Sequence, residues 1–159
     1  MTKEDVIQIA IAEIGYHEVG NNFSKYAEDL DKVSGFYNGV KNGFAWCDVF
    51  VDWCFVKAYG AELAKQLLCN NGNGCGAGCM YSALSFKQSG QWFTSPLPGD
   101  QIFFGTSGAE SHTGLVTEVS DNIVYTVEGN TSDMVLPRQY QIGSSSISGY
   151  GRPKWNLLN

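Results

Sequence analysis

Cys47 and His112 are the residues of this chain whose types could together perform nucleophilic chemistry. Cys47 lies in the stretch NGFAWCDVFVDWCF, residues 42–55, where a glycine-containing loop meets an apolar segment. A cysteine there could be a packing residue, half of a disulfide, a metal ligand or a nucleophile. If residues 46–59 form a helix, apolar side chains lie on nearly all of its sides, which is typical of a buried helix. The free N–H groups and dipole of its first turn favour a thiolate, the attacking form of cysteine.

A cysteine nucleophile also needs a base, usually an imidazole, and a third group that orients the base. The chain has two histidines. His17 follows the expected end of the first helix, and we interpret it as a surface or packing residue. His112 stands in the stretch ESHTGLV, at the start of a predicted strand, and is therefore the candidate base.

Two predicted strands, residues 113–119 and 122–130, contain alternating apolar residues. Because both apolar rows should face the core, we expect Leu115 to lie opposite Val127. The same condition pairs the ends of the two strands across a three-residue turn, residues 120–122. A two-residue turn would shift this register by one residue.

The predicted register gathers polar residues around His112. It places His112 across from Asn130, with Glu128 one pair further along on the same face. Neighbouring side chains on one face of a sheet lie roughly 4.5–8 Å apart, within reach of a hydrogen-bonded group. Gly114, opposite Glu128, leaves space there. We therefore predict that His112, Glu128 and Asn130 lie together.

The chain also divides into a helical first part and a strand-rich second part. The predicted helices cover residues 2–15, 23–30, 46–59, 61–68 and 79–89, and the predicted strands cover residues 99–104, 113–119, 122–130 and 148–153. Helices followed by an antiparallel sheet predict an α+β fold. The length suits a single domain over residues 1–159.

Four short motifs occur in one order along the chain: AWCDVFVDWCF, PLPGDQIFF, SHTGLV and VEGN. Together they resemble the CHAP family, the cysteine, histidine-dependent amidohydrolases/peptidases. These are papain-like (NlpC-type) peptidoglycan hydrolases, common as catalytic domains of bacteriophage endolysins. The family pattern is a cysteine at a helix N-terminus, a histidine opening a strand, and Glu-x-Asn on the next strand. The resemblance therefore implies Cys47, His112, Glu128 and Asn130 as catalytic residues.

The resemblance also implies an activity, namely cleavage of an amide bond of bacterial peptidoglycan through a cysteine thioester. Our first interpretation is an N-acetylmuramoyl-L-alanine amidase. A stem or cross-bridge endopeptidase with the same catalytic residues is the alternative. An acyltransferase or a protease acting on a non-wall substrate, and a binding module without turnover, are further alternatives.

We expect no cofactor and no metal. Cys69, Cys75 and Cys79 surround a glycine-rich loop, but they lack a fourth ligand and the usual zinc spacing, so a loop that contains thiols is favoured. Some CHAP domains bind calcium through an acidic loop before the nucleophile. Here residues 35–47 contain no carboxylate, so this property is not carried over. Asp48 is expected to be exposed, because its charge would otherwise oppose the thiolate.

Composition restricts the partners. The formal net charge is −6 without a basic patch, which argues against nucleic acid, and no stretch is long and apolar enough for a membrane span. The first residues do not resemble a signal peptide. We therefore expect synthesis in the host cytoplasm and action on the cell wall after release. A separate cell-wall-binding domain could supply targeting, since the wall is itself anionic.

Overall fold

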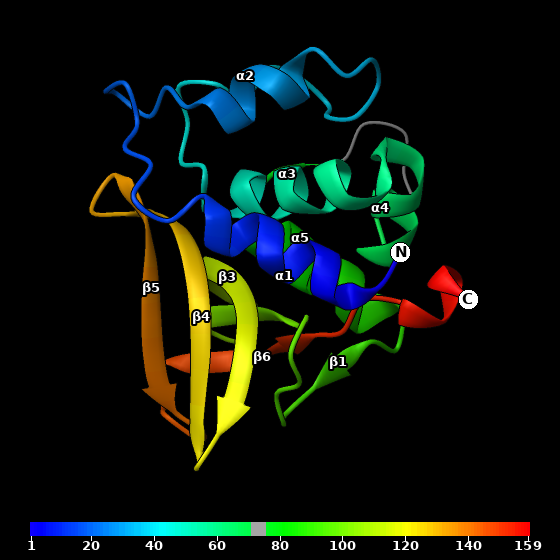
Figure 1. The fold of residues 1–159 in the computed structure, drawn as a ribbon, viewed down its shortest axis with the longest axis vertical. Coiled ribbons are helices and arrows are strands. Elements are labelled where there is room, and N and C mark those ends of the chain that lie inside the picture. The colour runs from blue at the N-terminus through cyan, green and yellow to red at the C-terminus, as the bar shows by residue number, and fades with distance from the viewer. Residues whose placement is uncertain (71–75) are drawn as a thin grey trace.

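The computed structural model describes residues 1–70 and 76–159. The elements are α1 (Lys3–Ala12), α2 (Lys25–Asp31), α3 (Cys47–Tyr59), α4 (Ala61–Leu67), α5 (Cys79–Gln88), β1 (Trp92–Phe93), β2 (Gln101–Thr106), β3 (Ala109–Ser120), β4 (Ile123–Thr131), β5 (Met134–Gln141), β6 (Ile147–Gly151) and a 3-10 helix, η1 (Trp155–Leu158). The helices come first and the sheet follows (Figure 1), so the predicted α+β class is confirmed.

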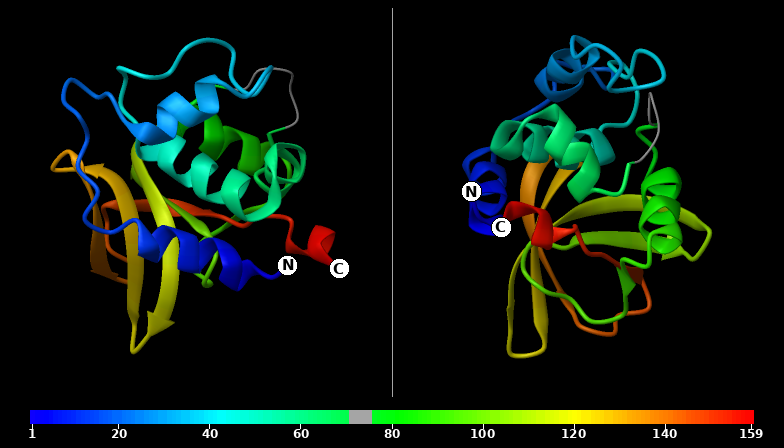
Figure 2. Two further views of the ribbon diagram at one scale, coloured as in Figure 1. Left: turned by 45° about the horizontal axis from the view of Figure 1, so that its top comes forward. Right: turned by 90° about the vertical axis from the view of Figure 1, so that its right-hand side faces the viewer.

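The six strands form one antiparallel sheet in the order β1-β6-β2-β3-β4-β5. Helix α3 is the centre of the helical layer, since it contacts α1, α2, α4 and α5 as well as β3 and β4. Figure 2 shows α2 on the side of α3 that faces away from the sheet. None of the helices in the described parts of the chain combines the length and apolar character that a membrane crossing requires.

Residues 47–55 of helix α3 are all buried, as the sequence predicts, and only the last turn reaches the surface. Val49, Phe50, Val51, Cys54 and Phe55 are fully buried. Cys54 is therefore a packing residue of the core. Because strands β3 and β4 pack against this helix, its first turn lies at the sheet, where the candidate base is located.

The hairpin between β3 and β4 corrects the predicted turn. The turn has two residues, Asp121 and Asn122, both with positive φ (51° and 64°), and Ser120 pairs with Ile123. Short polar side chains tolerate the left-handed conformation that such a tight turn needs. The predicted three-residue turn is therefore wrong.

The predicted register near the site nevertheless holds, because a bulge compensates for the shorter turn. The pairing shifts between Val116 and Glu118, and Leu115 lies opposite Val127, as predicted. A bulge adds one unpaired residue to one strand, so it restores the parity that the two-residue turn removes.

Candidate active site

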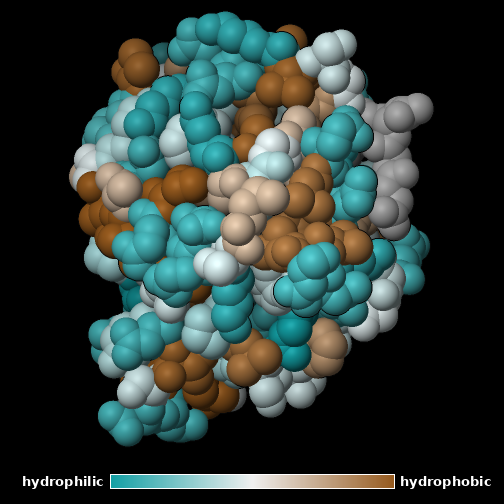
Figure 3. Space-filling model, turned by 45° about the vertical axis from the view of Figure 1, so that its right-hand side comes forward, coloured by the Kyte–Doolittle hydropathy of each residue, from teal (hydrophilic) through white to brown (hydrophobic). Residues whose placement is uncertain are grey.

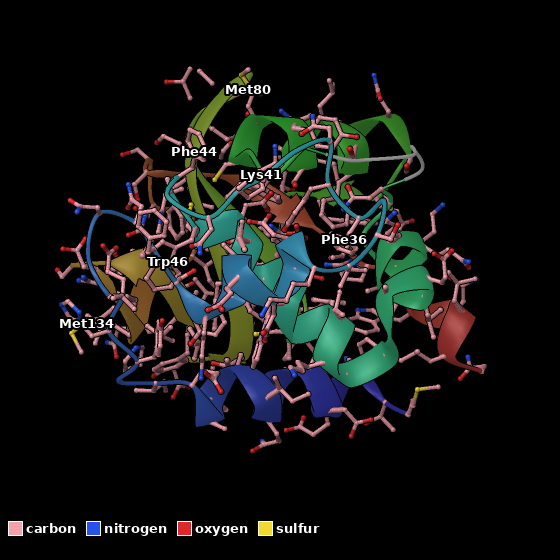
Figure 4. The ribbon with its side chains drawn as sticks, turned by 90° about the horizontal axis from the view of Figure 1, so that it is seen from above. Phe36, Lys41, Phe44, Trp46, Met80 and Met134 are labelled. Carbon is pink, nitrogen blue, oxygen red and sulfur yellow. The ribbon has the colours of Figure 1, made fainter. Side chains whose placement is uncertain are left out.

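Cys47 is the first residue of α3 and is 7% exposed. The preceding residue, Trp46, is fully buried, and its indole N–H donates to Oε1 of Glu18 at 3.0 Å. Tyr26 packs against the Trp46 ring at a centroid distance of 5.5 Å. Figure 4 labels Trp46, which directly precedes α3. The buried indole fixes the path of the chain into α3 and thereby positions the thiol.

His112 and Glu128 meet as the sequence predicts. Nε2 of His112 lies 2.8 Å from Oε1 of Glu128, which is 1% exposed. The Tyr140 hydroxyl donates to Oε2 of this carboxylate at 2.8 Å, and the Thr126 hydroxyl donates to the same oxygen. A Cβ on Gly114 would lie 2.5 Å from Cγ of Glu128, so the glycine provides the space for this side chain.

The His112 imidazole also interacts with the Cys47 thiol, and each shifts the pKa of the other. Since Nε2 faces Glu128, Nδ1 is the ring nitrogen left for Cys47. The pKa of Cys47 lies well below its usual range, first because of the Cys79 hydrogen bond and then because of the hydrogen bond and charge of His112, which outweigh burial. Burial lowers the pKa of His112, but hydrogen bonds and charges from Cys47 and Glu128 raise it to about 9. These shifts favour a thiolate–imidazolium pair at neutral pH.

Asn130 stays a prediction, since the described residues show no hydrogen bond between it and the imidazole. His112 pairs with Phe104 of β2, and the cross-strand pairs of β3 with β4 end at Leu115 and Val127. Asn130 has φ 54° and lies where the pairing of β4 with β5 is irregular. Among the residues that the structure describes, Glu128 and not Asn130 holds the ring of His112.

Asp48 is buried, and the expectation that it would be exposed is wrong. The side chain is 1% exposed and accepts hydrogen bonds from Oγ of Ser82 at 2.8 Å and from Nε2 of Gln101 at 2.9 Å. Gln101 also donates to Oγ1 of Thr113, next to His112 in the chain. Asp48 therefore ties α3 to α5, β2 and β3 beside the catalytic candidates. No local sequence pattern indicates these distant donors.

Burial is also why the Asp48 carboxyl does not oppose the thiolate as expected. Burial, together with the charge of Asp52, raises the pKa of Asp48 well above its usual range, although the bonds from Ser82 and Gln101 lower it. A raised pKa favours the neutral acid. The negative charge expected next to Cys47 is thereby reduced.

Cys79 is a neighbour of Cys47 that the sequence did not indicate. It is the first residue of α5, and its Sγ lies 3.4 Å from Sγ of Cys47. Cys69 lies just after α4, and its Sγ contacts the Leu67 carbonyl instead. Cys75 lies outside the described residues. Within residues 1–70 and 76–159, no three His, Cys, Asp or Glu side chains are grouped to hold a metal ion.

A pocket of about 270 Å³ lies between the two segments that precede Cys47 and Cys79. It is lined by Val40, Lys41, Phe44, Ala45, Ala77 and Gly78. Ala45 lies two residues before Cys47, and Gly78 directly precedes Cys79. Figure 4 shows Lys41 and Phe44 on the segment that leads into α3. Phe44 is 64% exposed. Figure 3 shows another face of the molecule, on which hydrophobic side chains are gathered between hydrophilic ones.

The comparisons with known proteins agree with this geometry. The CHAP domain matches residues 39–130, which is more than half of the chain, and the chain therefore belongs to the CHAP domain family. The family is that of the cysteine, histidine-dependent amidohydrolases/peptidases. No curated protein sequence matches the chain.

Solved structures share the fold. The chain is similar to Ly7917 (13% identity, TM-score 0.51, covering 96% of this chain and 62% of that one). It is similar to Ly7917 with the hydrolyzing product of MDP (14% identity, TM-score 0.54, covering 96% of this chain and 63% of that one). It is also similar to the NlpC/p60 domain of peptidoglycan hydrolase SagA (12% identity, TM-score 0.51, covering 95% of this chain and 98% of that one). These likenesses confirm the predicted papain-like fold. The chain spans less than two thirds of the Ly7917 chain.

Proposed function

We propose that this protein hydrolyses an amide bond in the peptide part of peptidoglycan, with Cys47 as the nucleophile and His112 as the base. The observation that carries the proposal is the placement of the Cys47 thiol at the N-terminus of α3, with its pKa lowered, next to an imidazole whose other nitrogen contacts Glu128 at 2.8 Å. Nucleophile, base and orienting group are the three parts that cysteine-dependent acyl transfer requires.

In the proposed mechanism the Cys47 thiolate attacks the amide carbonyl and forms a tetrahedral oxyanion. The backbone N–H of Cys47 has no carbonyl one turn earlier in the helix, so it is available to stabilise that oxyanion. The His112 imidazolium protonates the leaving amine, and a thioester remains. The neutral imidazole then removes a proton from water, which releases the acid and restores the thiolate.

Glu128 is proposed to hold the imidazole in the orientation that this exchange requires. Its second oxygen is held by Tyr140 and Thr126, so the carboxylate is itself fixed. Asn130 stays a prediction of the family pattern: a role near the oxyanion or the imidazole is consistent with its position after Glu128 on the same strand.

For the bond that is cut, we propose the amide between N-acetylmuramic acid and L-alanine. One neighbour in fold was solved with the hydrolyzing product of MDP, and another is a peptidoglycan hydrolase. The pocket beside Cys47 would receive an uncharged part of the substrate. A bond in the stem or cross-bridge is the alternative, because it needs the same catalytic residues.

We further propose that residues 1–159 act as one catalytic domain of a phage endolysin. On this hypothesis the protein is made in the host cytoplasm and reaches the wall after the membrane is breached. The partner is peptidoglycan, and neither nucleic acid nor a membrane takes part. A separate wall-binding domain would supply the affinity for the wall that a net charge of −6 does not favour.

The test is a digest of purified Gram-positive peptidoglycan with the wild type and with Cys47→Ala, read by mass spectrometry. Free stem peptides with an intact N-terminal L-alanine, absent with the variant, would support the amidase. Cut stems or bridges would instead support the endopeptidase. Product that depends on an added amine would indicate an acyltransferase. Undiminished product from Cys47→Ala would refute the mechanism.

A further inference from the structure

The Cys79 thiol forms no bond to the substrate and transfers no proton to it in the acyl-transfer steps, yet it lies against the proposed nucleophile and its hydrogen bond lowers the pKa of Cys47. The Sγ atoms of Cys47 and Cys79 are 3.4 Å apart, and both residues begin a helix. Each is less than one tenth exposed. Two thiols at this separation can be joined by a small movement of the side chains.

We propose that Cys79 is the resolving cysteine of an oxidative switch, which captures Cys47 as a reversible Cys47–Cys79 disulfide after a peroxide has oxidised Cys47. The proposal deepens the proposed function, because it rests on Cys47 being the nucleophile whose loss stops turnover. It gives Cys79 a modification chemistry that hydrolysis does not use.

The chemistry proceeds in two steps. The Cys47 thiolate attacks the O–O bond of a hydroperoxide. Its sulfur is oxidised to a sulfenic acid, and the other oxygen leaves as hydroxide, which takes a proton. The Cys79 sulfur then attacks the Cys47 sulfur, the S–O bond breaks, and the hydroxyl leaves as water with the Cys79 proton. With hydrogen peroxide, two thiols and one peroxide give one disulfide and two waters. A dithiol reductant restores both thiols.

The geometry suits the second step. A disulfide bond is about 2.05 Å long, so the two sulfurs must approach by about 1.4 Å from their 3.4 Å separation. The segment before Cys79 offers freedom for this movement, since Gly78 has no neighbour within 4 Å of the position a Cβ would occupy. The approach therefore needs an adjustment at the start of α5 and not a change of fold.

The two thiols also differ in pKa, in the direction that oxidation of Cys47 before Cys79 requires. With Cys47 as the thiolate, Cys79 is the donor of the hydrogen bond between the two sulfurs, and the pKa of Cys79 is raised first by this bond and then by burial and by the charge of Cys47. Cys47, as the thiolate, is therefore oxidised first. Its oxidation removes the charge that raises the pKa of Cys79, and Cys79 becomes a better nucleophile at that moment.

The other described thiols do not compete. Cys54 is fully buried, and burial raises its pKa well above the usual range. Cys69 contacts the Leu67 carbonyl, and burial raises its pKa as well. Cys69→Ser is therefore a matched control, since it removes a thiol near the start of the same loop without touching the pair.

The experiment treats the purified wild type, Cys79→Ser, Cys79→Ala and Cys69→Ser with hydrogen peroxide. Remaining thiols are then blocked, and unreduced peptides are mapped by mass spectrometry. Wall-digesting activity is measured before oxidation, after oxidation and after dithiothreitol, each as a fraction of the same variant's starting activity. Circular dichroism shows whether each variant is folded, and the alanine variant replaces the serine variant if the latter is not.

In the wild type and in Cys69→Ser, we expect a Cys47–Cys79 linked peptide that forms as activity is lost, and activity that returns with the reductant. In both Cys79 variants, Cys47 should instead proceed to sulfinic and sulfonic acids, which dithiothreitol does not reverse. The recovered fraction should then fall about fivefold or more below that of the wild type.

The proposal is overturned if Cys47 is linked to Cys75, if no linkage forms, or if the Cys79 variants recover as fully as the wild type. The mass measurement separates this result from the proposed function. A reduced wild type that does not digest the wall would refute the hydrolase proposal, while the presence or absence of the linked peptide still decides the role of Cys79.

Discussion

Replacing Glu128 by glutamine tests the electrostatic coupling of the site, because the substitution removes a charge and keeps the shape. In Glu128→Gln the new amide oxygen can still accept the hydrogen bond that Nε2 of His112 makes at 2.8 Å. The hydroxyls of Thr126 and Tyr140, which now donate to the second oxygen, can rotate and accept from the amide. The variant should therefore fold and lose mainly the negative charge.

The magnitude follows from the pKa of His112. Burial lowers this pKa, but hydrogen bonds and charges from Cys47 and Glu128 raise it from 6.5 to about 9. That rise corresponds to about 3 kcal/mol in favour of the imidazolium. If Glu128 supplies between a third and a half of the rise in pKa, Glu128→Gln lowers the pKa of His112 by about one unit. Because the pKa of His112 is raised in the folded state, protonated His112 stabilises the fold. This contribution to folding stability is complete below about pH 6.5 and is lost as the pH rises toward 9.

The assay is an NMR titration of the two imidazoles, with His17→Gln to assign the signals. In the wild type we expect His112 to titrate near 9, and in Glu128→Gln about one unit lower. The alkaline limit of kcat/KM should move down with it, and kcat/KM itself should fall about 10²-fold or more. A wild-type His112 that titrates near 6.5, or a titration that Glu128→Gln leaves in place, would refute the reasoning.

Three further predictions concern the thiol, a buried carboxyl and a glycine. Iodoacetamide at pH 6–7 should alkylate Cys47 before Cys54, Cys69 and Cys79, because among the described thiols only the pKa of Cys47 is lowered; peptide mapping of a time course checks this. Burial raises the pKa of Asp52 to about 7, so its contribution to folding stability should fall as the pH rises from 4 to 7; Asp52→Asn should reduce the pH dependence of stability and raise the free energy of unfolding at pH 8 by up to about 4 kcal/mol, measured by urea denaturation at pH 4 and pH 8. Gly114→Ala should lower activity at least tenfold, since its Cβ would displace Glu128, whereas Gly39→Ala, with open space around it, should not; equal activities would show that Glu128 tolerates displacement.

The sequence predicted the features that depend on local pattern. The apolar residues around α3 indicated a buried helix, and its first residue is the cysteine that the junction suggested. The alternation in β3 and β4 was enough to bring His112 to Glu128. The turn was wrong because parity alone cannot distinguish a three-residue turn from a two-residue turn followed by a bulge. Both place Leu115 opposite Val127.

The features that were missed depend on residues far apart in the chain. Strand β5 was not predicted because Pro137 interrupts its pattern; the strand lies at the edge of the sheet, where proline is tolerated. Asp48 was expected to be exposed because its negative charge beside Cys47 would otherwise oppose the thiolate. Its partners, Ser82 and Gln101, come from α5 and β2, and no local pattern indicates them.

The first turn of α3 explains why these distant contacts matter for the chemistry. Cys47 and Asp48 are adjacent on the helix and therefore point in different directions, about 100° apart. The cysteine faces His112 and Cys79, and the aspartate faces Ser82 and Gln101. The polar network on the second side favours the neutral carboxyl and fixes the end of the helix. The helix N-terminus is thereby left to stabilise one negative charge, that of the Cys47 thiolate.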